Sequence, residues 1–262
     1  CAFTSGTSTI ARLGCVDADG DGYSDPTSNW SIANGADALI SEPTQWFDQD
    51  GEGYGDNTAG LNPDGCPTVV GTSTADRYGC LDPDFDTYSS PDGAWFVSNG
   101  ADSCPSVLGT SSGDRNGCPD DDGDTYSDPD LSGTNGPVWL VSNGADAFTG
   151  DNTQWNDTDG DGPGDNPYGT QGDWFPNDAT RWQDSDRDGV ADEDDAFPND
   201  SSQIIDLDND GYGDDANGSD PDVFPDDPTE WADTDGDEVG NNADAFPFDP
   251  SQQTDSDGDG FG

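Results

Sequence analysis

The chain has 262 residues, with 59 acidic side chains against five basic ones and a formal net charge of −54 at pH 7. Leucine, isoleucine, valine and phenylalanine together number 34, about 13% of the chain, which is too few for an ordinary hydrophobic core. Lysine and histidine are absent, so the composition excludes a nucleic-acid partner held by phosphate neutralisation and disfavours an anionic membrane surface. Composition alone therefore describes a disordered polyanion or a salt-adapted protein.

The placement of the acids argues against both descriptions. They are 54 Asp and only five Glu, whereas salt adaptation would use Glu as freely. Three acidic residues at alternate positions recur in nine runs, which start at Asp17, Asp48, Asp82, Asp120, Asp157, Asp184, Asp206, Asp233 and Asp255. A disordered segment does not keep such a register, so the runs predict a tandem repeat.

The runs share a position code when their first Asp is numbered module position 1. Positions 1 and 3 are Asp in all nine runs, and position 5 is Asp in eight and Glu52 in one. Position 6 is Gly in six runs, as a tight loop with positive φ requires. Position 7 is mostly apolar or aromatic, so only its backbone carbonyl could reach a cation, and position 9 returns to Asp, Ser90 or Asn241. A further Asp follows three residues later in the two shortest modules and after an insertion in the others.

One module length explains all the spacings between runs, which are 31, 34, 38, 37, 27, 22, 27 and 22 residues. A 22-residue module takes insertions of 9, 5, 9, 15, 5, 0, 5 and 0 residues, with seven more in two cysteine-containing linkers. We expect a partial linker at 1–16, repeats at 17–47, 48–81, 82–119, 120–156, 157–183, 184–205, 206–232 and 233–254, and a partial repeat at 255–262. Both ends fall within a module, which favours a window on a longer chain over a polymer subunit completed by its neighbour.

The insertions and linkers carry their own local signals. The three longest insertions run from Trp30, Trp95 and Trp139 to Asn-Gly-Ala-Asp. Apolar residues before Asn-Gly predict a short β-hairpin, and a loop anchored by one Trp is the alternative. Linkers without cysteine place a Phe-Pro or similar apolar pair before a Trp or apolar residue. Between them, sequences such as Asp227-Pro-Thr-Glu predict a capped helical turn.

The six cysteines form three pairs, each separated by 14 residues. They stand in the registers that Phe-Pro and Trp occupy in other linkers, which predicts the pairs Cys1–Cys15, Cys66–Cys80 and Cys104–Cys118. A lipid-anchored Cys1 is the alternative for the first pair. Closing each of these loops with a disulfide should raise the free energy of unfolding by roughly 3 kcal/mol. An even number of evenly spaced cysteines predicts an extracellular or cell-surface location, and no apolar stretch predicts a membrane span.

Carboxylates and backbone carbonyls, without histidine, favour a large hard cation over zinc or copper. We predict roughly 9 to 18 calcium ions, at one or two per run. The expected ligands are Asp17, Asp19, Asp21, Tyr23, Asp25 and Asp37; Asp48, Asp50, Glu52, Tyr54, Asp56 and Asp64; Asp82, Asp84, Asp86, Tyr88 and Asp102; Asp120, Asp122, Asp124, Tyr126, Asp128 and Asp146; Asp157, Asp159, Asp161, Asp165 and Asp173; Asp184, Asp186, Asp188, Val190, Asp192 and Asp195; Asp206, Asp208, Asp210, Tyr212, Asp214 and Asp222; Asp233, Asp235, Asp237, Val239, Asn241 and Asp244; and Asp255, Asp257 and Asp259.

The pattern resembles the thrombospondin type 3 repeat, Asp-x-Asp-x-Asp-Gly-x-x-Asp-x-x-Asp, which the segment from Asp184 to Asp195 matches at every position. EF-hand and dockerin-type loops need flanking helices that Pro and Gly exclude here, and the Gly-Gly-x-Gly-x-Asp repeat of β-rolls is absent. The resemblance covers essentially the whole chain. It implies one or two calcium ions per run and little regular secondary structure, as in secreted and surface proteins of bacteria and archaea. The insertions and the disulfides within modules depart from the family pattern.

We therefore expect an irregular, calcium-stabilised tandem repeat, solenoid or rod-like, with short β-hairpin insertions and single helical turns. The expected function is that of a calcium-stiffened extracellular rod, serving as stalk, spacer, adhesin segment or filament subunit. Its partners would be calcium and either itself, head to tail, or a cell-surface glycan or protein. The alternative is a calcium-dependent binding module that uses exposed Trp and Tyr side chains.

Two further expectations concern chemistry outside the runs. We do not expect an enzyme, because the chain has no His or Lys and its acids are committed to metal. The glycan-acceptor pattern Asn-x-Ser/Thr occurs at Asn29, Asn156, Asn199 and Asn217.

Overall fold

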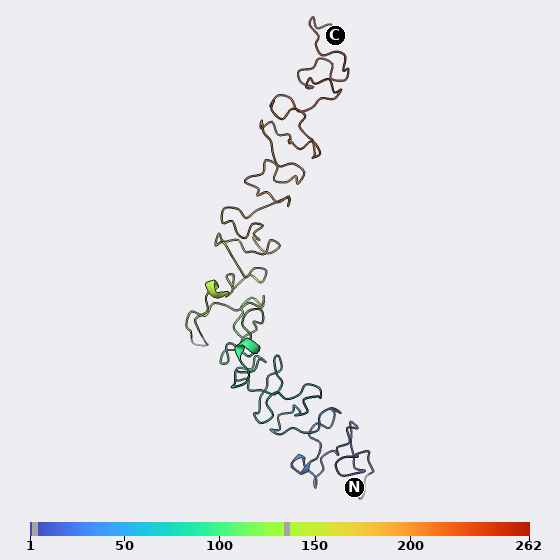
Figure 1. The fold of residues 1–262 in the computed structure, drawn as a ribbon, viewed down its shortest axis with the longest axis vertical. Coiled ribbons are helices and arrows are strands. Elements are labelled where there is room, and N and C mark those ends of the chain that lie inside the picture. Colours follow the sequence, from blue (N-terminus) through green and yellow to red (C-terminus); the bar gives the residue numbers. More distant parts are fainter. Residues whose placement is uncertain (2–4, 134–136) are drawn as a thin grey trace. The chain divides into compact units, whose positions relative to one another are not determined.

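The computed structural model describes residues 1, 5–133 and 137–262. This part of the chain has no α-helix and no β-sheet, and its regular elements are three 3-10 turns: η1 (Ile32–Asn34), η2 (Val97–Asn99) and η3 (Val141–Asn143) (Figure 1). Strand pairing is limited to isolated bridges between single residues. Over the same residues no helix is long and apolar enough to cross a membrane. The expected irregular fold is thus confirmed.

The chain divides into two compact units, Cys1–Asn156 and Asp157–Gly262. The first unit holds all three disulfides and all three 3-10 turns. The second unit is built from runs joined by linkers without cysteine. The two linker chemistries are therefore unevenly distributed along the chain.

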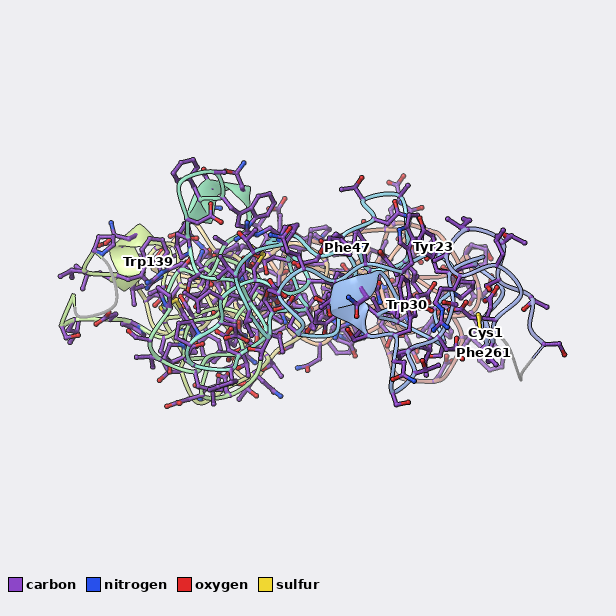
Figure 2. The ribbon with its side chains drawn as sticks, turned by 90° about the horizontal axis from the view of Figure 1, so that it is seen from below. Cys1, Tyr23, Trp30, Phe47, Trp139 and Phe261 are labelled. Carbon is purple, nitrogen blue, oxygen red and sulfur yellow. A yellow bond between two sulfur atoms is a disulfide. The ribbon has the colours of Figure 1, made fainter. Side chains whose placement is uncertain are left out.

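Burial in both units is polar rather than apolar. The buried apolar side chains of the described residues are all alanines or half-cystines: Cys15, Ala36, Cys80, Ala101, Cys104, Cys118, Ala145 and Ala191. Many large apolar side chains are exposed: Phe47 and Phe261, both labelled in Figure 2, are 50% and 79% exposed. The buried set contains eleven Asp and the side chains of Gln45, Gln154 and Gln203. A hydrophobic core therefore does not hold this chain together.

The structure confirms the three predicted disulfides, Cys1–Cys15, Cys66–Cys80 and Cys104–Cys118. Each closed loop contains a buried serine whose hydroxyl accepts the N–H of the second cysteine at 2.9 Å and donates to an arginine carbonyl four residues on. These serines are Ser8, Ser73 and Ser111. The same internal bonds in all three loops show that the linkers share one conformation, and the bridges indicate an oxidising environment.

Aromatic rings close three modules in the same way. The position-7 tyrosine stacks on the tryptophan two residues before the next run in the pairs Tyr23–Trp46, Tyr126–Trp155 and Tyr212–Trp231, with centroids 5.1, 5.2 and 4.8 Å apart. In the module that starts at Asp48, Tyr54 contacts Tyr78 at 5.5 Å instead.

Backbone bonds identify Tyr78 as the structural equivalent of the tryptophan. Its carbonyl accepts the N–H of Gly65 at 2.8 Å, as the Trp46 carbonyl accepts that of Ala38 at 3.1 Å. The carbonyl of Asn116 plays the same part for Ser103 at 2.8 Å. The expectation that Cys80 and Cys118 stand in the tryptophan position is therefore wrong by two residues, although the predicted pairing is right. The residue that makes this backbone bond, Tyr78 or Asn116, therefore lies two residues before the second cysteine of its loop.

The insertions do not form the expected hairpins. In each, the Asn-Gly pair ends a 3-10 turn, and the glycine adopts a left-handed conformation, with φ of 94°, 110° and 106° at Gly35, Gly100 and Gly144. Each glycine N–H donates to the carbonyl of the first residue of its turn. Within these insertions, strand pairing between described residues is reduced to the bridges of Thr27 with Trp30 and Asp130 with Trp139. The following alanine is buried, so the chain folds back at once instead of extending into a strand.

The predicted capped turn is present but does not grow into a helix. Asp227 accepts the N–H of Thr229 on its carboxylate at 3.2 Å, and its carbonyl accepts the N–H of Glu230 at 2.9 Å. Equivalent turns form at Asp200 and Asp249. The sequence thus specifies one hydrogen-bonded turn before each chain segment enters the next run.

We expect the double substitution Cys66→Ser and Cys80→Ser to lower the free energy of unfolding by about 3 kcal/mol, because the disulfide reduces the conformational entropy of the unfolded chain by that amount. Chemical denaturation followed by circular dichroism measures the change. Ser73→Ala with the bridge intact should cost about 1 to 2 kcal/mol, since two internal hydrogen bonds are lost. An unchanged denaturation midpoint in the cysteine variant would show that the hydrogen bonds alone fix the loop.

Candidate metal centres

All nine runs fold into the same loop around their first aspartate. Asp184 shows the pattern: its Oδ1 accepts the N–H of Arg187 at 2.6 Å, and its Oδ2 accepts the N–H of Gly189 at 3.0 Å. The position-1 carboxylate receives N–H groups from positions 4 and 6 in every run. The backbone therefore wraps around this carboxylate through its own hydrogen bonds, without the help of a cation.

This wrapping requires positive φ at two positions of each run. Position 6 is left-handed throughout, as its glycines predicted, and position 4 is left-handed throughout as well, for example at Gly20 (φ 86°) and Gly22 (φ 98°). Side chains occupy these positions in some runs, and Arg187 (φ 68°) and Glu238 (φ 73°) are strained as a result. The second glycine position was visible in the sequence and was not recognised there.

The next two acids of each run converge on one point. Asp186 Oδ1 accepts the N–H of Asp188 at 3.2 Å, and Asp188 Oδ1 accepts the N–H of Val190 at 2.8 Å. The Oδ2 atoms of both aspartates are buried without a hydrogen-bond partner. Carboxylate oxygens lie within 4.8 Å of one another in five groups and four more: Asp17, Asp19 and Asp21; Asp50, Glu52 and Asp64; Asp82, Asp84 and Asp86; Asp120, Asp122 and Asp124; and Asp157, Asp159 and Asp161.

A further buried aspartate joins the run in each complete module. These residues are 0% to 8% exposed, in spite of insertions of up to 15 residues before them: Asp37, Asp64, Asp102, Asp146, Asp173, Asp195, Asp222 and Asp244. One oxygen accepts an N–H from two residues on, as Asp195 does from Phe197 at 2.7 Å. The second oxygen is buried and unpartnered in all of them except Asp173. The structure therefore brings together residues that the sequence separates by variable lengths.

The crowding of these acids opposes their ionisation. Burial, reinforced by the carboxylates of Asp86 and Asp84, raises the pKa of Asp102 to about 7, against the lowering effect of the Cys104 N–H. Burial beside Asp21 and Asp19 likewise raises the pKa of Asp37 to about 6. Burial also raises the pKa of Glu52 to about 7. Ionisation of these three side chains is therefore opposed by burial and by the neighbouring carboxylates.

The predicted ligands at position 9 have a different first task. Their side-chain oxygen accepts the position-2 N–H, as Asp192 does from Ser185 at 2.7 Å and Asn241 does from Thr234 at 2.9 Å. The same bond forms in the runs of Asp25, Asp165 and Asp214. The position-9 side chain therefore closes the loop of its own run through a hydrogen bond to the backbone. Its role as a metal ligand stays a prediction.

The position-7 carbonyls keep their predicted ligand role as a prediction. No backbone hydrogen bond between the described residues ends on the carbonyl of Tyr23, Tyr88 or Val190. A carbonyl at this position would add a neutral oxygen to the carboxylate oxygens of its run. The last run is less enclosed, since Asp257 and Asp259 are exposed.

Sequence reasoning missed the residues that join one module to the next. Gln45 and Gln203 are each 1% exposed and lie one residue before the aromatic or apolar residue that ends the linker. Recurrence of Gln three residues before the next run, at Gln154 and Gln252 too, was the available signal. The cation–π contacts of Arg12, Arg77 and Arg115 with the insertion tryptophans had a signal too, because each arginine lies inside a disulfide loop.

No protein-family model matches the chain, and no curated protein matches its sequence.

We expect Asp102→Asn to change stability in opposite directions with and without a divalent cation. Without one, losing a buried charge beside Asp86 should raise the free energy of unfolding by about 1 to 3 kcal/mol, and with calcium the loss of a ligand should lower it by a similar amount. Denaturation in EDTA and in calcium measures both. Asp226→Asn is the control, since Asp226 is exposed and outside the runs. A change of the same sign in both media would contradict the assignment.

Proposed function

We propose that the chain is a calcium-binding structural repeat protein of the thrombospondin type 3 kind, in which bound ions take the place of a hydrophobic core. One observation carries the proposal. In module after module a buried aspartate returns to its run, and the facing carboxylate oxygens are buried with no donor to satisfy them. Buried polar atoms in folded proteins almost always have partners, so the orphaned oxygens support a cation at their centre.

The donor chemistry supports calcium over other metals. Calcium accepts six to eight oxygens in flexible geometry, whereas magnesium demands a near-ideal octahedron and keeps its waters. Variable position-5 and position-9 side chains suit the more flexible ion. At one or two ions per run, roughly 9 to 18 ions would neutralise only part of the charge, so the loaded protein stays acidic.

The proposed mechanical role follows from this source of stability. Each module brings its own site and linker, and modules that contact mainly their neighbours form quasi-one-dimensional arrays. We infer an extracellular stalk, spacer, adhesin segment or filament subunit, stiffened by calcium and stapled by disulfides. The chain lacks His and Lys, and we propose no catalytic activity for it.

Exposed apolar residues favour a second candidate, a calcium-dependent surface that binds a glycan or a protein. Phe96 and Val97, which follow Trp95 at the start of η2, are 53% and 50% exposed. The tryptophan rings themselves are less available, because Trp30 and Trp95 are only half-exposed and lie under Arg12 and Arg77 at 5.3 and 5.1 Å. The structural role therefore remains our first proposal.

Calcium removal tests the proposal directly. We expect EDTA to abolish the near-ultraviolet circular dichroism of the packed tyrosines and tryptophans and the cooperative thermal transition, because the apolar residues are too few to offset chain entropy. Native mass spectrometry should count roughly 9 to 18 calcium ions per chain, and an equal concentration of magnesium should not restore the fold. Spectra and melting temperature that are indifferent to EDTA would refute the proposed role of calcium.

A further inference from the structure

A buried glutamine joins consecutive modules in each unit. Gln203 Nε2 donates to the carbonyls of Asp215 at 3.1 Å and Ser219 at 2.9 Å, and its Oε1 accepts the N–H of Asp215 at 2.9 Å. Gln45 repeats the arrangement with Asn57 and Leu61, at 3.0 and 3.1 Å for the donated bonds and 2.9 Å for the accepted one. Both amides are 1% exposed. The end of one linker is thus fastened to the backbone of the module that follows.

This glutamine needs a glycine at position 8 of the following module. A Cβ atom added at Gly213 would lie 2.1 Å from the side chain of Gln203, and one at Gly55 would lie 2.3 Å from that of Gln45. Neither glycine has a positive φ, so the requirement concerns space and not backbone conformation. We call this pairing of Gln with Gly the glutamine junction.

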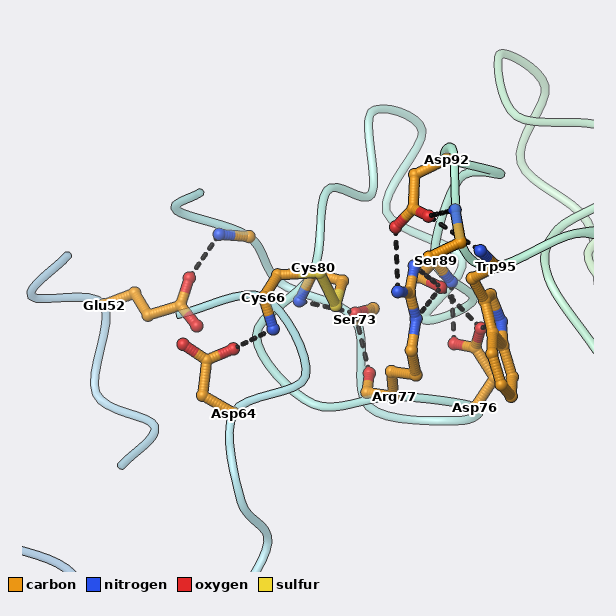
Figure 3. The surroundings of a disulfide bond; sticks show 12 residues. Glu52, Asp64, Cys66, Ser73, Asp76, Arg77, Cys80, Ser89, Asp92 and Trp95 are labelled. Atoms are coloured by element: carbon orange, nitrogen blue, oxygen red, sulfur yellow. Dashed lines mark hydrogen bonds and ion pairs between the residues drawn. A yellow bond between two sulfur atoms is a disulfide. The ribbon is translucent and has the colours of Figure 1, made fainter. Parts of the chain in front are cut away.

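Disulfide loops join the next module through a different set of contacts. Asp76 lies between Cys66 and Cys80, and its carboxylate accepts the N–H of Ser89 at 2.8 Å and the Trp95 Nε1–H at 2.9 Å (Figure 3). Ser89 occupies position 8 and is fully buried.

Arg77 completes this second arrangement. Its guanidinium lies 5.1 Å from the Trp95 ring centroid and donates to the Ser89 hydroxyl at 3.1 Å and to Asp92 at 2.9 Å. We call the set of Asp, Arg, position-8 Ser and insertion Trp the disulfide junction.

The Cys104–Cys118 loop has all the residues of the disulfide junction, whereas the Cys1–Cys15 loop lacks the Asp. Asp114 bonds the N–H of Ser127 at 2.9 Å and Trp139 Nε1 at 3.2 Å, and Arg115 lies 5.2 Å from the Trp139 ring. In the first loop Ala11 stands where the others have Asp. There the hydroxyl of Ser24 and Nε1 of Trp30, the atoms such an Asp would bind, are buried without a hydrogen-bond partner.

The two junction types also separate in the sequence. Position 8 is Ser after each disulfide loop and Gly after each linker with Gln before its last aromatic or apolar residue: Ser24, Ser89 and Ser127 against Gly55, Gly164 and Gly213. The long tryptophan insertions occur only in the modules that follow disulfide loops. The disulfide loops and the linkers with Gln are therefore each matched in residue type to the module that follows them.

We propose that the glutamine and disulfide junctions are two matched interaction surfaces by which a linker recognises the module that follows it. The partner of each linker surface is a module with the right residue at position 8, Gly for one and Ser with an insertion Trp for the other. This inference rests on the repeat arrangement in the proposed function. It makes the order of the modules specific and fixes the mutual orientation of neighbouring calcium sites, which a flexible string of sites would not do.

Hydrogen exchange on the full calcium-loaded chain tests the glutamine junction. Gln203→Ala and Gly213→Ala should each raise amide exchange in the segment 213–222 by about tenfold, because each breaks the same buried contact. The double variant should add little to either single one, since both remove one interface. Gln49→Ala is the matched control, as Gln49 is exposed.

Calcium content, measured on the same samples, separates this inference from the proposed function. Faster exchange with an unchanged number of ions supports the junction. Unchanged exchange in both single variants overturns it, as does faster exchange that only accompanies loss of ions. The ion count of the unsubstituted chain tests calcium binding independently.

The incomplete first junction allows a test by gain. Ala11→Asp should raise the melting temperature of the calcium-loaded chain by about 2 °C, because the new carboxylate reaches two orphaned donors. Asp76→Ala should lower it by a similar amount. Ser28→Asp adds the same charge at an exposed position of the same module and should bring no gain. A melting temperature that Ala11→Asp lowers or leaves unchanged would overturn the disulfide junction.

Discussion

The structure depends on the repulsion between carboxylates that the backbone holds together. In each run the first aspartate is tied to two N–H groups, and in the first eight runs the next two acids each bury a carboxylate oxygen that has no hydrogen-bond donor. In a protein with a hydrophobic core, the free energy gained by apolar burial could offset the cost of such unpaired buried carboxylates. Here the buried apolar side chains of the described residues are alanines and half-cystines, which offer little apolar burial to offset that cost. The stability of the fold therefore depends on the cation that we propose.

The repulsion explains why the remaining structure is so strongly cross-braced. Disulfide loops, stacked Tyr–Trp pairs and arginine–tryptophan contacts all lie between the charged loops. None of them is extensive, and each acts over a short stretch of chain. Their common effect is to hold the irregular segments in place so that the acids of a run and the returning aspartate meet. Stability is thus spread over many small contacts, and no single layer of the molecule provides it.

Local chemistry decided which features the sequence could predict. The runs, the returning aspartates such as Asp195 and the disulfide pairs follow from spacing, because each depends on residues close in the chain. The turn at Asn-Gly was mistaken for a hairpin, since the same dipeptide suits a left-handed glycine in either setting. The tryptophan register was misplaced at Cys80, because Tyr78 holds the equivalent backbone bond. Gln203 was overlooked although Gln recurs at this register, because a polar side chain is not expected to be buried, and its burial against the next module shows its part.

The hydrogen bonds within each unit also bear on how the chain acquires its structure. Even the longest-range of those between disulfide junction residues, from Trp139 to Asp114, spans only 25 residues. Proteins dominated by such local contacts pay little loop-closure entropy before their native contacts form, and they fold fast for their size. With calcium bound as we propose, a module would close as soon as its own residues meet the ion, without waiting for the rest of the chain. If such a chain is secreted one end first, this favours vectorial folding, in which each completed module serves as the template for the next one.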